Sequence, residues 1–144
     1  NRATAWLKKI FEGQNIRHIL IMPSLKRILF WDFLIETDSH HYVGQIGALK
    51  PVLQMKANLP KYEILSPTAM KAQSTPLGTF FKTFTPYAYF EEQCDTNVLK
   101  VNIYDLRYFL NEQFLHRATI IFNDASIPLT SYLHSEGRTI KVPC

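Results

Sequence analysis

The sequence predicts an α+β fold that is rich in strands: a mainly antiparallel sheet with an N-terminal amphipathic helix and a second helix near residues 75–85. Of the 144 residues, 47% are hydrophobic and 19% are charged, which is typical of a globular protein and not of a disordered chain. Ten Phe, seven Tyr and two Trp favour a β-rich core. Short turns join the expected strands without β-α-β alternation, so the strands should pair antiparallel.

Residues 3–11 predict the first helix. Their apolar side chains follow the spacing of one helix face: Ala3, Trp6, Leu7, Ile10 and Phe11. Gly13 follows as the expected stop.

Four segments of the first half have the character of strands. Residues 16–22 are rich in β-branched side chains and end at Pro23, and residues 28–36 are apolar and aromatic enough for a central strand. A polar turn leads into residues 41–48, so these two segments should form a hairpin. Residues 52–65 are expected to hold at most one or two short edge strands.

A second helix is predicted after residue 75. Ser74 or Thr75 can cap it and Pro76 suits its first turn. Its apolar residues at helical spacing are Leu77, Phe80, Phe81 and Phe84. Pro86 ends it.

Strands dominate the rest of the chain. Residues 87–92 and 98–105 flank a turn at 94–97, which predicts a second hairpin. Three further strands are expected, at residues 116–122, 128–134 and 139–142.

Length predicts one hydrophobic core, so we expect residues 1–144 to form a single soluble domain. No stretch reaches the roughly 20 apolar residues that span a bilayer. The chain starts at Asn1 without Met and runs straight into a helix, which indicates a fragment of a longer protein. Cys94 and Cys144 are expected to be free thiols.

The net charge is +4 and the basic residues are scattered. A nucleic-acid-binding face usually carries a denser basic stripe, so no nucleic acid is expected as a partner. The chain also has no GxGxxG, P-loop or GxSxG pattern. Nucleotide-binding loops and nucleophilic catalysis are therefore not indicated.

The densest polar cluster is expected at the tip of the first hairpin. It consists of Glu36, Asp38, His40 and His41. These side chains can bind zinc or act as acid and base. Neighbouring residues of a strand point to opposite faces, so His40 and His41 converge only if a turn separates them. The cluster is either a metal site or a solvated turn, and we favour the turn.

Asp105 and Arg107 form the second candidate site. They lie two residues apart at the end of a strand and so share one face. The pair could hold a carboxylate or phosphate through a bidentate contact, or it could fix the end of the strand. We favour the structural role. His18, His116 and His134 are isolated in expected strands and carry no functional signal.

Three stretches resemble the C-terminal half of one family. They are FWDFLIETDSHHYVGQI (30–46), LGTFFKTFTPYAYFEE (77–92) and VNIYDLRY (101–108), preceded by Met22-Pro23. In this order they resemble the membrane-bound metal-dependent hydrolases, also described as LexA-binding inner-membrane-associated hydrolases. The matching residues are Trp31, Glu36, Pro86, Tyr87, Asp105 and Arg107.

The resemblance implies a bacterial protein whose membrane-embedded N-terminal half carries the catalytic residues and a divalent metal such as zinc. That half is absent here and would be the partner of this chain. Basic residues just after a membrane span, here Arg2, Lys8 and Lys9, favour the cytoplasmic side. No catalytic residue can be assigned, and the ligand-binding candidates are Trp31, Tyr87, Asp105 and Arg107.

Three hypotheses follow. The leading one is an accessory soluble domain of a membrane-bound metal-dependent hydrolase, without the catalytic metal centre and without a cofactor of its own. The alternative is a non-catalytic module that binds a small anionic molecule at Asp105 and Arg107, or a protein at an edge strand. The third is a self-contained metal site at residues 36–41.

Overall fold

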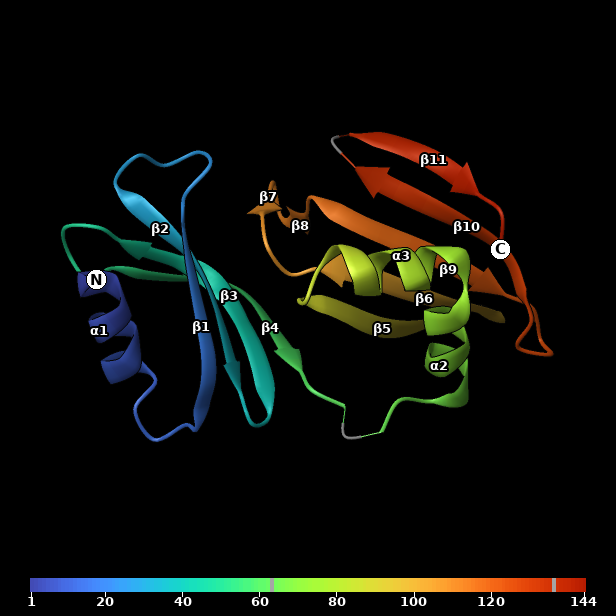
Figure 1. Ribbon diagram of the computed structural model, residues 1–144, viewed down its shortest axis with the longest axis horizontal. Helices are drawn as coiled ribbons and strands as arrows, with labels where there is room; N and C mark the ends of the chain where they lie inside the picture. The colour runs from blue at the N-terminus through green and yellow to red at the C-terminus, as the bar shows by residue number, and fades with distance from the viewer. Residues whose placement is uncertain (63, 136) are drawn as a thin grey trace. The chain divides into compact units, whose positions relative to one another are not determined.

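The computed structural model describes residues 1–62, 64–135 and 137–144. The chain divides into two compact units, Asn1–Tyr62 and Glu63–Cys144 (Figure 1). Length led us to expect one core, but the described residues form two separate core clusters, one in each unit. A short meander of hairpins with one or two helices can bury a core of its own, so length did not fix the number of cores.

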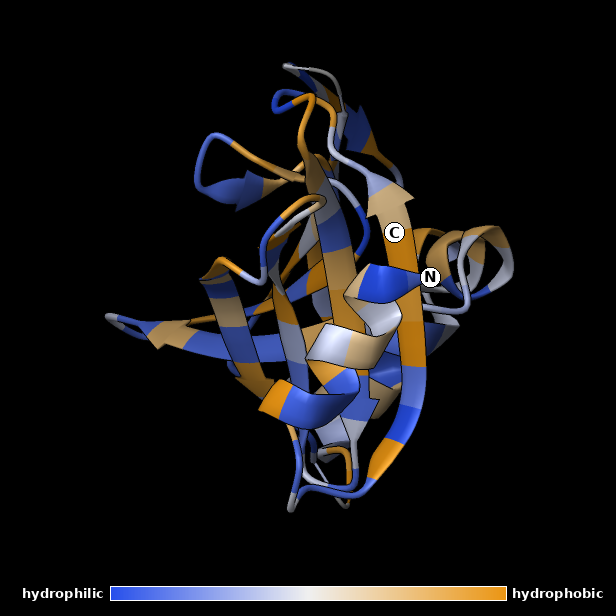
Figure 2. Ribbon diagram, turned by 90° about the vertical axis from the view of Figure 1, so that its left-hand side faces the viewer, coloured by the Kyte–Doolittle hydropathy of each residue, from blue (hydrophilic) through white to orange (hydrophobic). Residues whose placement is uncertain are grey.

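The first unit is one helix and a four-stranded antiparallel sheet in the order β1-β2-β3-β4. Its elements are α1 (Arg2–Ile10), β1 (Ile16–Pro23), β2 (Phe30–Thr37), β3 (His40–Gly47) and β4 (Leu53–Pro60). Each strand pairs with the next one along the chain. Helix α1 lies across one face of this sheet (Figures 1 and 2).

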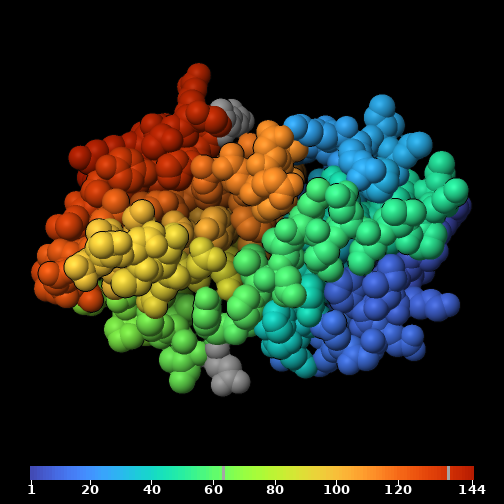
Figure 3. All heavy atoms as spheres, turned by 180° about the vertical axis from the view of Figure 1, so that it is seen from behind, coloured from blue at the N-terminus to red at the C-terminus, as the bar shows by residue number. Residues whose placement is uncertain are grey.

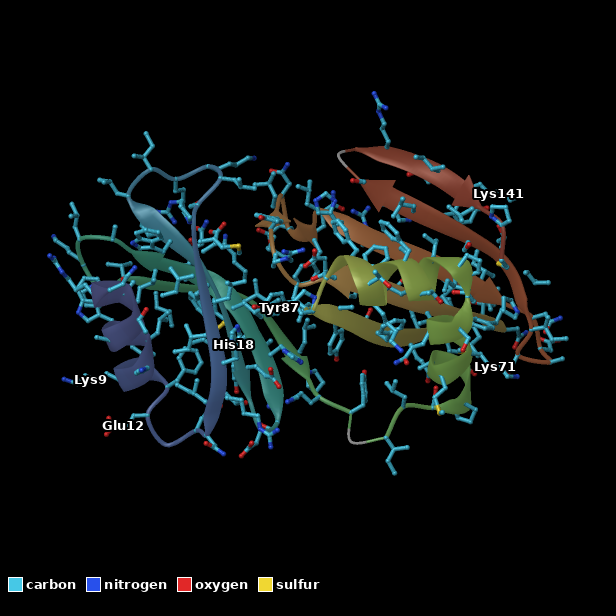
Figure 4. The ribbon with its side chains drawn as sticks, viewed as in Figure 1. Lys9, Glu12, His18, Lys71, Tyr87 and Lys141 are labelled. Carbon is cyan, nitrogen blue, oxygen red and sulfur yellow. The ribbon has the colours of Figure 1, made fainter. Side chains whose placement is uncertain are left out.

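The core of the first unit lies between α1 and the sheet. Leu7 of α1 and Ile35 of β2 are completely buried there, and Phe33 is 1% exposed. Successive strand residues point to opposite faces, and hydrophilic and hydrophobic residues accordingly alternate as bands along the strands in Figure 2. Lys9 and Glu12 are exposed and project away from the sheet (Figure 4).

Both edge strands of the first sheet carry an irregularity. The register shifts between Ile16 and His18 in β1, which leaves Arg17 as an extra residue. The register also shifts at Val43–Gly44, where Lys56 is the extra residue of β4. Each of the two edge strands ends in proline, Pro23 in β1 and Pro60 in β4.

The second unit is a two-helix layer on a five-stranded antiparallel sheet in the order β11-β10-β9-β6-β5. Its helices and long strands are α2 (Pro67–Ser74), α3 (Pro76–Phe84), β5 (Ala88–Asp95), β6 (Val98–Asp105), β9 (His116–Phe122), β10 (Pro128–Ser135) and β11 (Arg138–Val142). A small hairpin of β7 (Phe109–Leu110) and β8 (Gln113–Phe114) connects β6 to β9.

The core of the second unit lies under its helices. Val101, Ile103 and Ile120 of the sheet are fully buried against Phe81 of α3, which is 1% exposed, and Ala72 of α2. Most neighbours of these residues along the strands are polar, because the two helices of this unit pack on one face of its sheet. The α+β fold class is therefore confirmed: in the described residues antiparallel sheets dominate and three helices accompany them.

A single threonine joins the two helices of the second unit. Thr75 is the C-cap of α2 and also the N-cap of α3. Its hydroxyl donates to the carbonyl oxygen of Ala72 over 2.6 Å and accepts from the amide nitrogen of Gly78 over 3.1 Å. A Cβ on Gly78 would lie 2.8 Å from the Cα of Gln73, so only glycine allows this close approach.

Most expected elements are confirmed with small changes in their bounds. The strand at 116–122 has the predicted bounds, and the helix predicted near 75–85 runs from Pro76 to Phe84. The described part of residues 52–65 contains one edge strand, β4. Two elements were missed, helix α2 and the β7–β8 hairpin, because both are short and neither has a clear apolar period. Ile28 and Leu29, predicted to begin β2, lie in the preceding loop.

The longest helices in the described part of the chain have nine residues. None of the described helices is long and apolar enough to cross a membrane. Cys94 and Cys144 are both free and exposed, as predicted.

Replacing Thr75 by valine is expected to destabilise the second unit by about 1–3 kcal/mol. The change keeps the shape of the buried side chain but removes the hydroxyl that serves both helices. Urea unfolding followed by far-UV circular dichroism measures the effect. Thr75→Ser retains the hydroxyl and should lose less than half as much stability; equal losses in the two variants would contradict the capping role.

Candidate functional site

The predicted pair Asp105 and Arg107 lies where β6 ends. Asp105 is the last residue of β6, and its side chain faces the helix layer on the same side as Val101 and Ile103. It is completely buried, with 0% exposure. Burial of a charged carboxylate is costly unless it is paired and hydrogen-bonded, so its partners decide what this site can do.

Asp105 is satisfied by two neighbouring residues. Arg107 donates from Nη2 to Oδ2 over 2.7 Å and from Nε to Oδ1 over 3.1 Å, which is a bidentate ion pair. The backbone nitrogen of Arg107 donates to Oδ1 over 3.1 Å, and the Thr85 hydroxyl donates to the same oxygen over 3.2 Å. This pairing also raises the pKa of the Arg107 guanidinium above its ordinary value.

Three aromatic rings surround the guanidinium of Arg107. Its central carbon lies 5.9 Å from the ring centroid of Phe84 and 5.8 Å from those of Tyr87 and Tyr108. Such distances allow cation–π contact. We call Asp105, Arg107, Phe84, Tyr87 and Tyr108 the Arg107 cluster.

Tyr108 adopts a backbone conformation that bulky residues rarely take, with φ of +60°. This conformation places its ring beside Arg107 and beside His116, whose ring centroid is 6.3 Å away. Strained backbone of this kind concentrates at functional sites, where the surrounding structure maintains it.

His116 completes the surroundings of the Arg107 cluster. Its ring lies edge-on to Phe84 at a centroid distance of 6.0 Å. Its Nδ1 is 2.9 Å from the hydroxyl of Ser135. His116 was predicted to be an isolated strand residue; the contact with Phe84 joins residues far apart in the sequence, which no local pattern reveals.

Three of the four ligand-binding candidates come together in the second unit. Asp105, Arg107 and Tyr87 belong to the Arg107 cluster, and Tyr87, labelled in Figure 4, directly precedes β5. Trp31 is partly buried and packs against the core of the first unit. Thr85, Phe84 and Tyr108 were not among the predicted site residues, although Phe84 and Thr85 immediately precede Pro86 and the candidate Tyr87.

The metal candidates at the tip of the first hairpin diverge. Asp38 pairs with Arg17 over 2.5 Å, and Glu36 pairs with Lys61 over 2.6 Å. The ring of His40 stacks on Tyr42 at a centroid distance of 5.6 Å, on the sheet face opposite to His41. Among the residues that the structure describes, no group of three His, Cys, Asp or Glu could hold a metal ion.

One row of side chains does converge on the sheet face away from α1. Glu36 pairs across the strands with His18 on one side and His41 on the other. The hydrogen bond from Lys61 holds the pKa of Glu36 below its ordinary value. Burial lowers the pKa of His41, and Glu36 opposes part of this effect.

The second unit defines an α+β domain with two helices on one face of an antiparallel sheet. The family model of the YfhP C-terminal alpha/beta plait domain matches residues 67–141, slightly more than half of the chain. The chain therefore belongs to this family. The match runs from Pro67, the first residue of α2, to Lys141 of β11. No curated protein and no solved structure matches the chain.

The family match corrects the resemblance found in the sequence. The matched family is the YfhP C-terminal alpha/beta plait domain and not a family of metal-dependent hydrolases, so the assignment to membrane-bound metal-dependent hydrolases was wrong. The short stretches that suggested it, around Tyr87 and Asp105, are the hairpin ends that build the Arg107 cluster. Nothing in the match supports the expectation of hydrolysis, of a catalytic metal or of a membrane-embedded partner half.

Acidification is expected to destabilise the first unit through His41. Because the folded state lowers the pKa of this imidazole below its ordinary value of 6.5, the unfolded chain binds more protons just below that pH. The stability that neutral His41 contributes to the folded first unit is therefore fully present above pH 6.5 and is lost as the pH falls below this value.

Urea unfolding at about pH 7.5 and about pH 5.5 tests this dependence. The tryptophan fluorescence of Trp6 and Trp31 reports on the first unit alone, because the sequence has only two tryptophans. In His41→Gln the free energy of unfolding should change less between these two pH values than in the wild type. An equal change in the variant and the wild type would rule out His41 as the source of the pH dependence.

Asp105→Asn is expected to lower the free energy of unfolding of the second unit by about 3 kcal/mol, because it breaks a buried ion pair. Far-UV circular dichroism during urea unfolding measures the loss. Asp95→Asn, at an exposed aspartate at the end of β5, is the matched control and should change stability by less than about 0.5 kcal/mol.

Proposed function

We propose that this chain is a non-catalytic binding module whose second unit binds an anionic group, a carboxylate or a phosphate, at Arg107. The observation that carries the proposal is the fixed orientation of the guanidinium: Asp105 holds Nε and Nη2 from one side. A side chain that is already immobilised loses little further entropy on binding a ligand.

The other edge of the guanidinium is where a ligand would bind. In the described parts of the chain, Arg107 donates hydrogen bonds from its Nε, its Nη2 and its backbone nitrogen, and none from Nη1. The Arg107 side chain is 24% exposed. A carboxylate or phosphate oxygen could therefore accept a hydrogen bond from Nη1 without displacing Asp105.

The rings of the Arg107 cluster favour an anion with an apolar body. Phe84 is 46% exposed, and Tyr87 and Tyr108 are partly buried. An aromatic or aliphatic body could pack on these rings while its charged end meets the guanidinium. Because Asp105 already neutralises Arg107, we expect millimolar affinity for simple anions.

Titration of the chain with phenyl phosphate, benzoate, inorganic phosphate and acetate tests the proposal. The nuclear magnetic resonance signal of the Arg107 Nε–H should shift on titration, and the two aromatic anions should bind about three- to tenfold more tightly than the others. Arg107→Lys keeps the charge but loses the planar fork, and should weaken binding at least fivefold. Arg138→Gln, at an exposed arginine of β11, is the control; no shift of Arg107 with any of the four anions would refute the proposal.

Tyr108→Gly separates the binding role of the ring from its structural role. Glycine accepts a positive φ without strain, so the free energy of unfolding should stay within about 1 kcal/mol of the wild-type value. Binding of phenyl phosphate should nevertheless weaken severalfold, because one ring of the Arg107 cluster is lost. Wild-type affinity in this variant would show that Tyr108 takes no part in binding.

A further inference from the structure

Two loops of the first unit lie together at one end of its sheet. Residues 24–29 connect β1 to β2, and residues 48–52 connect β3 to β4. Both are at the same end, because Phe30 pairs with Gly47 at the ends of their strands. The backbone nitrogen of Ala48 donates to the carbonyl oxygen of Leu29 over 2.8 Å and joins them directly. We call residues 24–29 and 48–52 the loop pair.

The loop pair exposes large aliphatic side chains. Ile28 is 97% exposed and Leu49 is 64% exposed. Three more aliphatic residues of the loop pair are over half exposed: Leu25, Leu29 and Val52. In Figure 3 the light-blue atoms of the first loop project from the surface of the first unit. Exposed apolar residues gathered in this way mark an interaction surface.

The charge of the loop pair has one sign. Lys26, Arg27 and Lys50 lie among the aliphatic residues, and the two loops contain no Asp or Glu. Basic residues interleaved with protruding aliphatic ones fit a bilayer surface, where lipid phosphates meet the cations and the acyl boundary accepts the apolar side chains. A protein interface would more often be flat and centred on aromatic residues.

The loop pair is held in shape before any partner arrives. The Arg27 guanidinium donates to the side-chain oxygen of Gln54 over 2.9 Å and lies over the ring of Phe30 at 3.4 Å. The backbone nitrogen of Phe30 donates to the carbonyl oxygen of Arg27, and the backbone nitrogen of Val52 donates to the carbonyl oxygen of Lys50. Backbone groups that are paired internally can approach the apolar part of a bilayer at lower cost.

From these features we infer that the loop pair docks on an anionic membrane surface, with Ile28 and Leu49 at the acyl boundary and the three basic residues at the level of the lipid phosphates. The inference concerns the first unit and does not depend on the Arg107 cluster. The partner assigned to the loop pair is a lipid surface, and the experiment below distinguishes it from a protein partner.

Co-sedimentation of the 144-residue chain with vesicles tests the inference. Vesicles of phosphatidylcholine mixed with phosphatidylglycerol should bind the chain on the order of tenfold more tightly than phosphatidylcholine alone, and high salt should remove this difference. Equal binding to both vesicles at low salt, or no binding to either, would overturn the inference.

Two variants locate the contact. Ile28→Ser combined with Leu49→Ser should weaken binding on the order of tenfold, and both sites are exposed, so folding should not suffer. Ile127→Ser is the matched control, because Ile127 is an aliphatic residue that is 55% exposed in the loop between β9 and β10 of the second unit, outside the loop pair. Equal vesicle binding by the double variant and the control would overturn the inference. The inference would also be overturned if the wild-type chain does not bind vesicles and instead self-associates through Ile28 and Leu49, because the surface would then be a protein interface.

Discussion

The buried carboxylate of Asp105 is the interaction on which the candidate site depends. It ends β6, and through Thr85 it fixes the residue at which α3 ends. The Thr85 hydroxyl also accepts from the backbone nitrogen of Tyr87 over 3.0 Å, which sets the start of β5. The end of α3, the β5–β6 hairpin and the Arg107 guanidinium therefore meet at the Asp105 carboxylate. A buried carboxylate without partners would strongly destabilise the fold. The rings near Arg107 keep their places because of this convergence.

Local patterns in the sequence predicted most of the fold. The stripe from Ala3 to Phe11 and the turn before Val98 need only a few neighbouring residues, and the structure has both α1 and the β5–β6 hairpin. The helix α2 was missed although Ser66 and Pro67 are good start signals, because its eight residues have no clear apolar stripe. The division into two cores was missed because it depends on which hairpins share a face, and length carries no information about that.

The candidate site was only partly predictable. Alternation along a strand correctly separated His40 from His41, and a spacing of two correctly placed Asp105 beside Arg107. Alternation could not show that Lys61 would engage Glu36, since that contact joins segments 25 residues apart. Nor could any local pattern place Phe84 and His116 together. The family resemblance failed for a related reason: the short stretches around Tyr87 and Asp105 lie at the end of a hairpin, and such stretches carry no information about activity.

The irregular edges of the first sheet have a consequence for solubility. An open edge strand offers unpaired backbone groups to the edge of another molecule, and this is a common route to aggregation. Here β1 and β4 each carry a bulge whose extra residue is basic, Arg17 or Lys56, and each ends in a proline. A second copy could not continue the ladder without meeting a broken register and a like charge. These features oppose growth of the four-stranded sheet into a fibre at either of its edge strands.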